Sequence, residues 1–201
     1  ELKMLKRPII GMMGNLYHGY DFKLLNDIIS KKREWSFVFV GEVAENAKRD
    51  VTNLSKHSNF HLFGWRAYEE LPCFLKGFDV AIIPYKVNEW TNTINPNKVY
   101  DYFAAGVPVV ATPIEELLRL SECLCICNGS REFLKGIETA IKGNMHDKVQ
   151  TAIEVAKNLS WEKITDNILK EICERILVTD KVISKTSQSV IPAKAGIQRK
   201  A

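Results

Sequence analysis

The stretch Asn95-Pro-Asn-Lys-Val-Tyr-Asp-Tyr-Phe-Ala-Ala-Gly-Val-Pro-Val-Val-Ala-Thr112 decides the fold. It opens with a helix start, because Asn95 suits an N-cap and Pro96 suits the first helical position, where its missing N–H is not needed. Gly106 is a helix stop, and the β-branched run that follows it is typical of a strand. The stretch therefore predicts a helix over residues 96–105 and a strand over residues 107–111.

The same alternation of short apolar runs and longer helical patterns continues in both directions. Further strands are predicted at residues 8–13, 36–40, 60–63, 80–84 and 123–127, with helices between them. Asp21 is the expected N-cap of the first helix, and Ser160 that of the longest one, at residues 161–177. This pattern predicts an α/β fold, a Rossmann-like doubly wound parallel sheet, which a helical segment follows from Arg131 onward.

Length and charge indicate one domain with a basic tail. The 201 residues are 46% hydrophobic, enough for one core over residues 1–179. Residues 180–201 lack periodicity and are expected to be a disordered tail. The tail holds 5 of the 28 Lys and Arg residues, so 28 minus 5, or 23, stand against 24 Asp and Glu residues in the remainder. The body is about neutral, and the net charge of +4 does not favour a nucleic-acid partner.

Cysteine usage favours a reducing compartment. Five cysteines and no signal-like start argue against a disulfide framework, so we expect a cytoplasmic protein. No apolar run approaches the roughly 20 residues that span a bilayer, so we expect at most peripheral contact at the inner face of the membrane. Cys123, Cys125 and Cys127 alternate on one face of a strand, where small buried apolar side chains are favoured over a metal site. The first residue, Glu1, suggests a fragment.

A site for a nucleoside diphosphate is predicted where the strand at residues 80–84 ends, since ligands of parallel sheets collect beyond the carboxyl ends of the strands. The helix start at Asn95 exposes backbone N–H groups that favour a phosphate, and Lys98 adds a positive charge. Asp101, one turn later, suits two ribose hydroxyls. The alternative from these residues alone is a capped helix with a solvent-facing Lys98–Asp101 pair.

The stretch from Asn95 to Thr112 resembles the nucleotide-sugar-binding segment of bacterial GT-B glycosyltransferases of group 1, similar to family 4, which build surface polysaccharides. Other segments match the same domain in order, namely Ser36–Gly41, Phe63–Arg66, Tyr68–Pro72 and Gly77–Pro84. The resemblance covers about residues 8–116, and residues 161–177 resemble the usual closing helices. It implies the C-terminal, donor-binding half of such an enzyme.

The resemblance also implies roles for individual residues. Asp101 matches the acidic residue that binds the donor ribose, and the backbone of Ile94 and Asn95 matches the loop that holds the diphosphate. Further substrate-binding positions are implied in the loops after the first three strands: Gly14 and Asn15 facing the phosphates, Gly41 closing the second strand, and Arg66, where backbone atoms read the base.

Two departures from the family pattern concern catalysis. Many retaining members carry an acidic residue eight positions before the ribose-binding one, and here that position is Thr93, which leaves donor-sugar selection and a retaining outcome open. Many relatives also place Arg or Lys after the first strand, whereas residues 14–22 offer only His18. His18 is a candidate for phosphate or sugar contact or a loop residue without a role, and Lys98 is the candidate substitute for the missing cation.

The implied activity is transfer of a hexose-like sugar from a nucleoside-diphosphate sugar, with UDP as the expected nucleotide, to a hydroxyl of a polysaccharide or lipid-linked acceptor. No cofactor or metal is expected. The acceptor is expected to bind an N-terminal domain, so these residues alone should bind nucleotide and transfer little. Two alternatives remain open, a non-catalytic nucleotide-binding or partner module and a GT-B epimerase acting on a UDP-sugar. A dehydrogenase is disfavoured, because Gly11, Gly14 and Gly19 do not form G-x-G-x-x-G.

Overall fold

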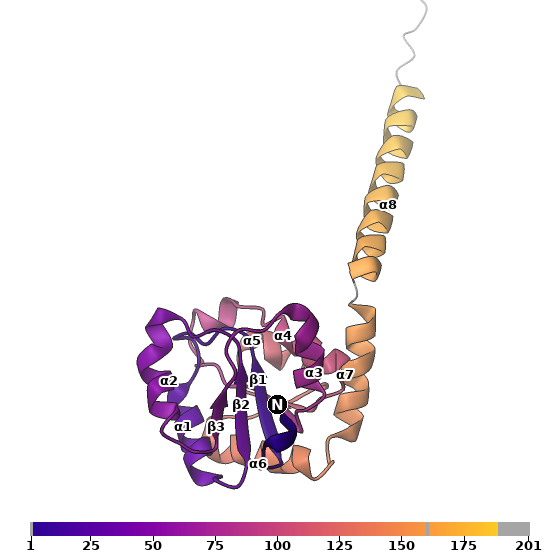
Figure 1. Cartoon of the computed structure of the whole chain (residues 1–201). Coiled ribbons are helices and arrows are strands. Elements are labelled where there is room, and N and C mark those ends of the chain that lie inside the picture. Colours follow the sequence, from indigo (N-terminus) through magenta and orange to yellow (C-terminus); the bar gives the residue numbers. More distant parts are fainter. Residues whose placement is uncertain (1, 160, 189–201) are drawn as a thin grey trace, which may run out of the picture. The chain divides into compact units, whose positions relative to one another are not determined.

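The structure is a computed structural model that describes residues 2–159 and 161–188. The chain divides into two compact units, residues 1–157 and 158–201. The first contains the sheet and its helices, and the second consists, where it is described, mainly of one long helix, as Figure 1 shows. The predicted domain limit at residue 179 stays a prediction.

The first unit is built on a six-stranded sheet with the order β3-β2-β1-β4-β5-β6. All the neighbouring strands are parallel, which confirms the predicted doubly wound α/β fold. The strands are β1 (Ile9–Met13), β2 (Ser36–Val40), β3 (Phe60–Leu62), β4 (Val80–Ile83), β5 (Val109–Ala111) and β6 (Cys125–Ile126). Every residue of β1, β2, β4 and β5 is buried, as expected of strands covered on both faces.

The helices alternate with these strands. They are α1 (Phe22–Lys31), α2 (Lys48–Leu54), α3 (Leu71–Leu75), α4 (Lys98–Ala104), α5 (Glu115–Leu118), α6 (Gly129–Ile141) and α7 (His146–Asn158). The chain moves across the sheet in one direction from β1 to β3 and in the other from β4 to β6, so right-handed crossovers place α1 and α2 on one face and α4 and α5 on the other. α6 packs against α1.

The first helix follows the sequence prediction. The Asp21 side chain accepts a hydrogen bond of 2.9 Å from the Leu24 N–H, so Asp21 is the N-cap. The apolar side of the helix is buried, with Phe22, Leu24, Leu25, Ile28 and Ile29 in the core. The cap and the apolar stripe together fix α1 against the sheet.

The start of α4 differs from the prediction. The helix begins at Lys98, its N-cap is Asn97, and no side chain caps it, so Asn95 is not the N-cap and Pro96 is not the first helical residue. The reason is a tight turn before the helix, in which the Asn97 N–H donates to the Asn95 carbonyl and the Val99 N–H to the Pro96 carbonyl. Asn95 thus contributes its backbone oxygen rather than its side chain.

The end of α4 is as predicted, and its geometry explains the short strand after it. Gly106 has a φ of +68°, its N–H donates to the Phe103 carbonyl, and the Val107 N–H donates to the Tyr102 carbonyl. These two bonds form a Schellman motif, which glycine favours. Because Val107 still closes the helix, β5 begins at Val109 rather than at residue 107.

The loops after β1 and β4 meet where the strand order reverses. Tyr20 and Tyr85 form an antiparallel bridge, the Asp21 N–H donates to the Pro84 carbonyl at 2.8 Å, and the Lys86 N–H donates to the Gly19 carbonyl at 2.9 Å. In open parallel sheets this reversal opens a crevice for ligands. The fold therefore positions these two loops beside the expected binding site.

The second unit contains α8 (Trp161–Gln188). The sequence predicted a helix to residue 177 and a tail from residue 180, so the predicted tail overlaps the helix at residues 180–188. No Pro or Gly occurs between Trp161 and Gln188 to end the helix sooner. Ser160, the predicted cap, and residues 189–201 lie outside the described residues. Among the helices that are described, none is both long and apolar enough to cross a membrane.

Gly11 provides a test of the packing at the centre of the sheet. A Cβ atom at Gly11 would lie 2.1 to 2.3 Å from ring atoms of Phe78, and β1 is held by a strand on each side. We expect Gly11→Ala to lower the free energy of unfolding by about 1 to 3 kcal/mol in urea denaturation. In a Phe78→Leu background the smaller side chain leaves room, so the same substitution should be less destabilising there. Equal losses in both backgrounds would contradict this explanation.

Candidate functional site

Three glycines follow the first three strands at their carboxyl ends. The surface that their backbone atoms form is called the glycine ledge. Gly14, Gly41 and Gly64 have φ values of +103°, +146° and +66°, a region that favours glycine. The Gly14 N–H donates to the Val40 carbonyl at 2.9 Å, and the Gly41 N–H donates to the Gly64 carbonyl at 2.7 Å. A Cβ at Gly41 would lie 2.3 Å from the Gly14 oxygen, so this close approach requires glycine.

Lys98 extends from the first turn of α4 to this ledge. A Cβ at Gly14 would lie 2.9 Å from the Lys98 Nζ, and that ammonium donates to the Tyr20 hydroxyl. The Nζ also lies 5.0 Å from the Tyr20 ring centroid and 5.6 Å from that of Tyr85. Burial lowers the pKa of Lys98, while Tyr85 opposes the shift. In residues 2–159 and 161–188 no carboxylate forms an ion pair with Lys98, so its surroundings suit an anionic ligand.

The tyrosines around Lys98 are site residues that the sequence analysis did not identify. The rings of Tyr20 and Tyr85 stack with centroids 4.7 Å apart, and their hydroxyls are 3.4 Å apart. Tyr17 meets Tyr20 edge to face at 5.2 Å. Burial raises the pKa of Tyr20, so its hydroxyl stays neutral and does not balance the ammonium charge. The available sequence signal was two tyrosines in the loop after the first strand and one directly after Pro84.

Asp101 lies one turn after Lys98 and remains separate from it. Its carboxylate is half-buried, and desolvation raises its pKa. The described part of the chain contains no ion pair between Lys98 and Asp101, because the lysine turns to Tyr20. The solvent-facing pair considered as an alternative is therefore absent. The two charged groups are available for two different parts of one ligand.

The loop before α4 is fixed by its own hydrogen bonds. The Thr91 hydroxyl is buried, donates to the Lys86 carbonyl at 2.5 Å, and accepts from the Asn88 N–H at 3.0 Å. The Thr93 hydroxyl donates to the Trp90 carbonyl at 2.8 Å, and the Thr93 side chain is exposed. Ile94 is extended, with φ of −90° and ψ of 142°. Thr93 and Ile94 thus reach α4 in a defined conformation, and the exposed Asn95 follows them.

His18 and Asn15 lie in the loop after β1, and both are exposed. The His18 ring stacks on Trp90 with centroids 5.2 Å apart. His18 therefore belongs to the aromatic group that Tyr17 joins to Tyr20.

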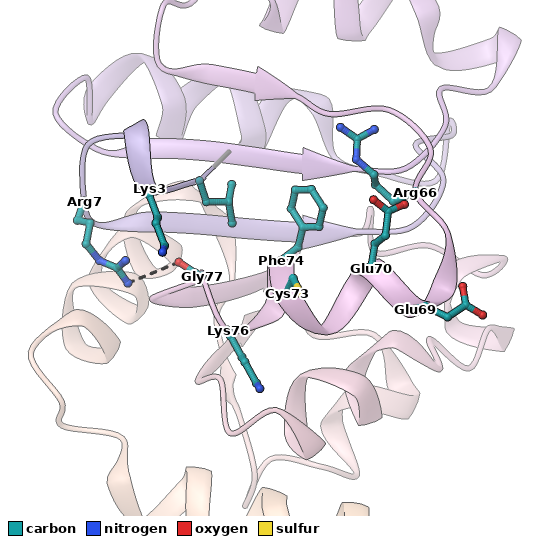
Figure 2. Close-up of a pocket in the computed structure, with 10 residues that line it drawn as sticks. Lys3, Arg7, Arg66, Glu69, Glu70, Cys73, Phe74, Lys76 and Gly77 are labelled. Carbon is teal, nitrogen blue, oxygen red and sulfur yellow. Dashed lines mark hydrogen bonds between the residues drawn. The ribbon is translucent and has the colours of Figure 1, made fainter.

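Arg66 follows Gly64 and faces a different cavity. Its Nη1 donates to the Trp65 carbonyl at 3.0 Å, and its guanidinium lies 5.6 Å from the Phe74 ring centroid. Figure 2 shows Arg66, Glu70 and Phe74 around this cavity of about 620 Å³. Of the predicted site residues only Arg66 lines it. Gly14, Gly41, Lys98 and the tyrosines thus lie together, whereas the Arg66 side chain lines a separate cavity.

Within the described residues, no three His, Cys, Asp or Glu side chains are grouped to hold a metal ion. Cys123 and Cys127 are buried, as expected of small apolar residues, and the Cys125 and Cys127 Sγ atoms are 3.6 Å apart. The strand is shorter than the predicted residues 123–127, because β6 contains only Cys125 and Ile126, and Cys125 is partly buried. These cysteines lie on β6 and beside it, at the far edge of the sheet from β3.

Sequence comparisons relate the chain to known proteins. Residues 7–142 match the family described as glycosyl transferases group 1. The chain is 27% identical over 114 residues to TuaH of Bacillus subtilis (strain 168), which is named as a teichuronic acid biosynthesis glycosyltransferase; the match covers 57% of this chain and 29% of TuaH.

Solved structures share the fold. Anabaena HepE in complex with UDP and glucose superposes with a TM-score of 0.65 at 17% identity, over 85% of this chain and 48% of HepE. WaaG, a glycosyltransferase involved in lipopolysaccharide biosynthesis, gives a TM-score of 0.58 at 12% identity, over 79% of this chain and 45% of WaaG. The chain thus spans less than a third of TuaH and about half of these two structures.

The burial of Asp101 predicts a gain in stability when its charge is removed. Its raised pKa means that the unfolded chain ionises more readily than the folded one, so above the ordinary value of about 3.9 the carboxylate destabilises the fold. We expect Asp101→Asn to raise Tm at pH 7, and the gain to disappear as the pH falls to about 4 and below. Asp147→Asn, at an exposed position of α7, is the matched control and should give no such gain. A lower Tm for Asp101→Asn at pH 7 would contradict this prediction.

Proposed function

Since this chain belongs to group 1 of the glycosyl transferases, we propose that it is the donor-binding half of an enzyme that transfers a sugar from a nucleoside-diphosphate sugar to a hydroxyl of a polysaccharide or lipid-linked acceptor. The observation that carries the proposal is the Lys98 ammonium, which lies buried against the Gly14 ledge without a carboxylate partner among the described residues. The diphosphate of a nucleotide-sugar donor would supply the negative charge that pairs with Lys98.

The diphosphate is proposed to bind between Lys98 and the loops that end at Gly14 and Asn95. Gly14 is exposed and lacks a side chain, so a phosphate can approach the backbone at the end of β1. α4 has only seven residues, so its dipole is a smaller contribution than the full charge of Lys98. Asn15 and Ile94 lie in the two loops and are proposed to contribute backbone contacts.

The nucleoside is proposed to extend from this point past Asp101. A half-buried carboxylate can accept hydrogen bonds from two vicinal ribose hydroxyls, and this would offset its desolvation. The base is proposed to reach the loop after β3, where the backbone at Arg66 would read it. UDP is the favoured nucleotide, because HepE, which shares the fold, has been solved with UDP and with UDP-glucose.

Catalysis is proposed to depend on charge compensation without a metal. When the bond between sugar and phosphate breaks, negative charge grows on the departing diphosphate, and a fixed ammonium stabilises that charge more than it stabilises the bound donor. Lys98 is proposed for this role. Thr93 replaces the second acidic residue of many relatives and is proposed to contact a sugar hydroxyl or a phosphate instead.

The acceptor is proposed to bind a part of the whole enzyme that lies outside these residues. The matched part of this chain covers 29% of the length of TuaH and 48% of that of HepE. TuaH is named for teichuronic acid and WaaG is described as involved in lipopolysaccharide biosynthesis, so a cell-envelope polymer is the favoured acceptor class.

Calorimetry with UDP, GDP and dTDP tests the donor site. We expect one of the three to bind, and Asp101→Asn to weaken it by about 1 to 3 kcal/mol, because a carboxylate–hydroxyl pair is lost. Asp147→Asn should leave the affinity unchanged. Failure of all three nucleotides to bind at millimolar concentration would overturn the proposed function. Binding that Asp101→Asn does not alter would show that the ribose lies elsewhere.

Lys98 is tested by comparing a nucleoside diphosphate with its nucleoside. We expect Lys98→Met to weaken the diphosphate about 10- to 100-fold, as the loss of a hydrogen bond to a charged group implies, and to leave the nucleoside unchanged. Lys135→Met removes an exposed lysine of α6 and should change neither affinity. If the nucleoside lost as much affinity as the diphosphate, Lys98 would not be the phosphate ligand.

A further inference from the structure

His18 is exposed, yet three hydrogen bonds and a stacked ring hold it in place. Its backbone N–H donates to the Asn46 Oδ1 at 3.3 Å, and its ring Nδ1 lies 2.8 Å from the Asn46 Nδ2. Its carbonyl accepts from the Lys86 Nζ at 2.8 Å, and its ring stacks on Trp90 at an interplanar angle of 23°. Asn46 comes from the loop after β2, and Lys86 and Trp90 come from the loop after β4, so two neighbouring loops hold His18.

The Asn46 amide determines where the imidazole carries its proton. A backbone N–H can only donate, so the amide oxygen must face the His18 N–H and the amide NH₂ must face the ring. An NH₂ group can also only donate, so Nδ1 must be the unprotonated acceptor. The neutral ring then carries its hydrogen on Nε2. Asn46 therefore selects one tautomer of His18.

Parallel pairing of the two loops sets up this contact. Leu16 and Val43 form a parallel bridge, the Leu16 N–H donates to the Glu42 carbonyl at 2.8 Å, and the Ala44 N–H donates to the Leu16 carbonyl at 2.8 Å. His18 and Asn46 each follow their half of this bridge by two or three residues. The β1 and β2 ends thus continue beyond the sheet and bring the imidazole and the amide together.

We infer that Asn46 is a positioning residue that keeps the His18 Nε2–H as a neutral hydrogen-bond donor to the diphosphate of the nucleotide. In the described part of the chain the Nε2 atom has no partner, while every other polar group of His18 is engaged. Ring contacts connect His18 through Tyr17 to Tyr20, whose hydroxyl accepts a hydrogen bond from Lys98. This inference rests on the proposed function.

The arrangement gives the site two donors of different kinds. Lys98 supplies a buried positive charge at Gly14, and His18 supplies an oriented N–H from the exposed side of the loop. Because its orientation is fixed before the ligand arrives, little entropy is lost when the hydrogen bond forms. Lys98 and this neutral donor together would replace the Arg or Lys that many relatives place after the first strand.

Ring-nitrogen NMR tests the tautomer directly. In the full chain with ¹⁵N-labelled histidine at pH 8.5, we expect the wild-type His18 to be protonated at Nε2, with His18→Phe identifying its signals. A carboxylate only accepts, so Asn46→Asp should move the proton to Nδ1. Asn53→Asp, at an exposed position of α2, should leave the His18 signals unchanged. A wild-type ring protonated at Nδ1 would overturn the role of Asn46.

Calorimetry under the same conditions tests the ligand contact with UDP and uridine. His18→Phe keeps a ring to stack on Trp90 but has no N–H, and Asn46→Asp turns a lone pair toward the ligand. We expect each variant to weaken UDP about tenfold and to leave uridine unchanged, with Asn53→Asp as the control. Unchanged UDP binding in both variants, or an equal loss of uridine binding, would overturn the inference about His18. UDP binding by the wild type would still support the proposed function. No nucleotide binding by the wild type would overturn both the proposed function and this ligand contact, and the NMR result would still decide the tautomer.

Discussion

The parallel pairing of β1 with β2 on one side and β4 on the other is the constraint on which the site depends. Parallel strands end at the same edge, so the loops that follow β1, β2 and β4 emerge side by side. The strand order reverses between β1 and β4. There the loop after β1 pairs with the loop after β4 through the Tyr20–Tyr85 bridge. Lys98 is far in sequence from Gly14 and Tyr20, and it meets them because of that topology.

Local patterns predicted the elements well where one physical rule dominated. The β2 limits, the Asp21 cap and the Gly106 stop follow from an apolar run, a short acceptor side chain and a positive φ. The predicted start of α4 was wrong, because Asn95 and Pro96 suit a tight turn as well as a helix cap. In the structure these residues form the turn. Sequence alone could not weigh these two outcomes.

The site was predictable in part, for a related reason. Lys98 and Asp101 are neighbours on one helix, so their spacing gave their approximate places. Their partners are set by contacts across the chain. The Tyr20 hydroxyl, 78 residues before Lys98, turns the ammonium away from Asp101. The Asn46 amide that meets His18 lies 28 residues away and carries no motif of its own.

The desolvation of Lys98 and Asp101 lowers the stability of the fold. An ammonium and a carboxylate one turn apart would ordinarily help each other, yet here both are desolvated and they form no ion pair. Such an arrangement is common where binding groups are held ready for a ligand, because the ligand rather than the fold completes their interactions.

The backbone surface formed by Gly14, Gly41 and Gly64 affects how a nucleotide would be held differently from how its base and sugar would be selected. At Gly14, Gly41 and Gly64 the molecular surface is peptide backbone, and peptide groups stay the same when neighbouring side chains change. In the proposed donor site, a phosphate chain that rests on such a surface would be recognised by features that all nucleotide sugars share. The choice of base and of sugar would then be left to side chains at either end of the ledge, which can be exchanged during evolution without rebuilding the strands beneath.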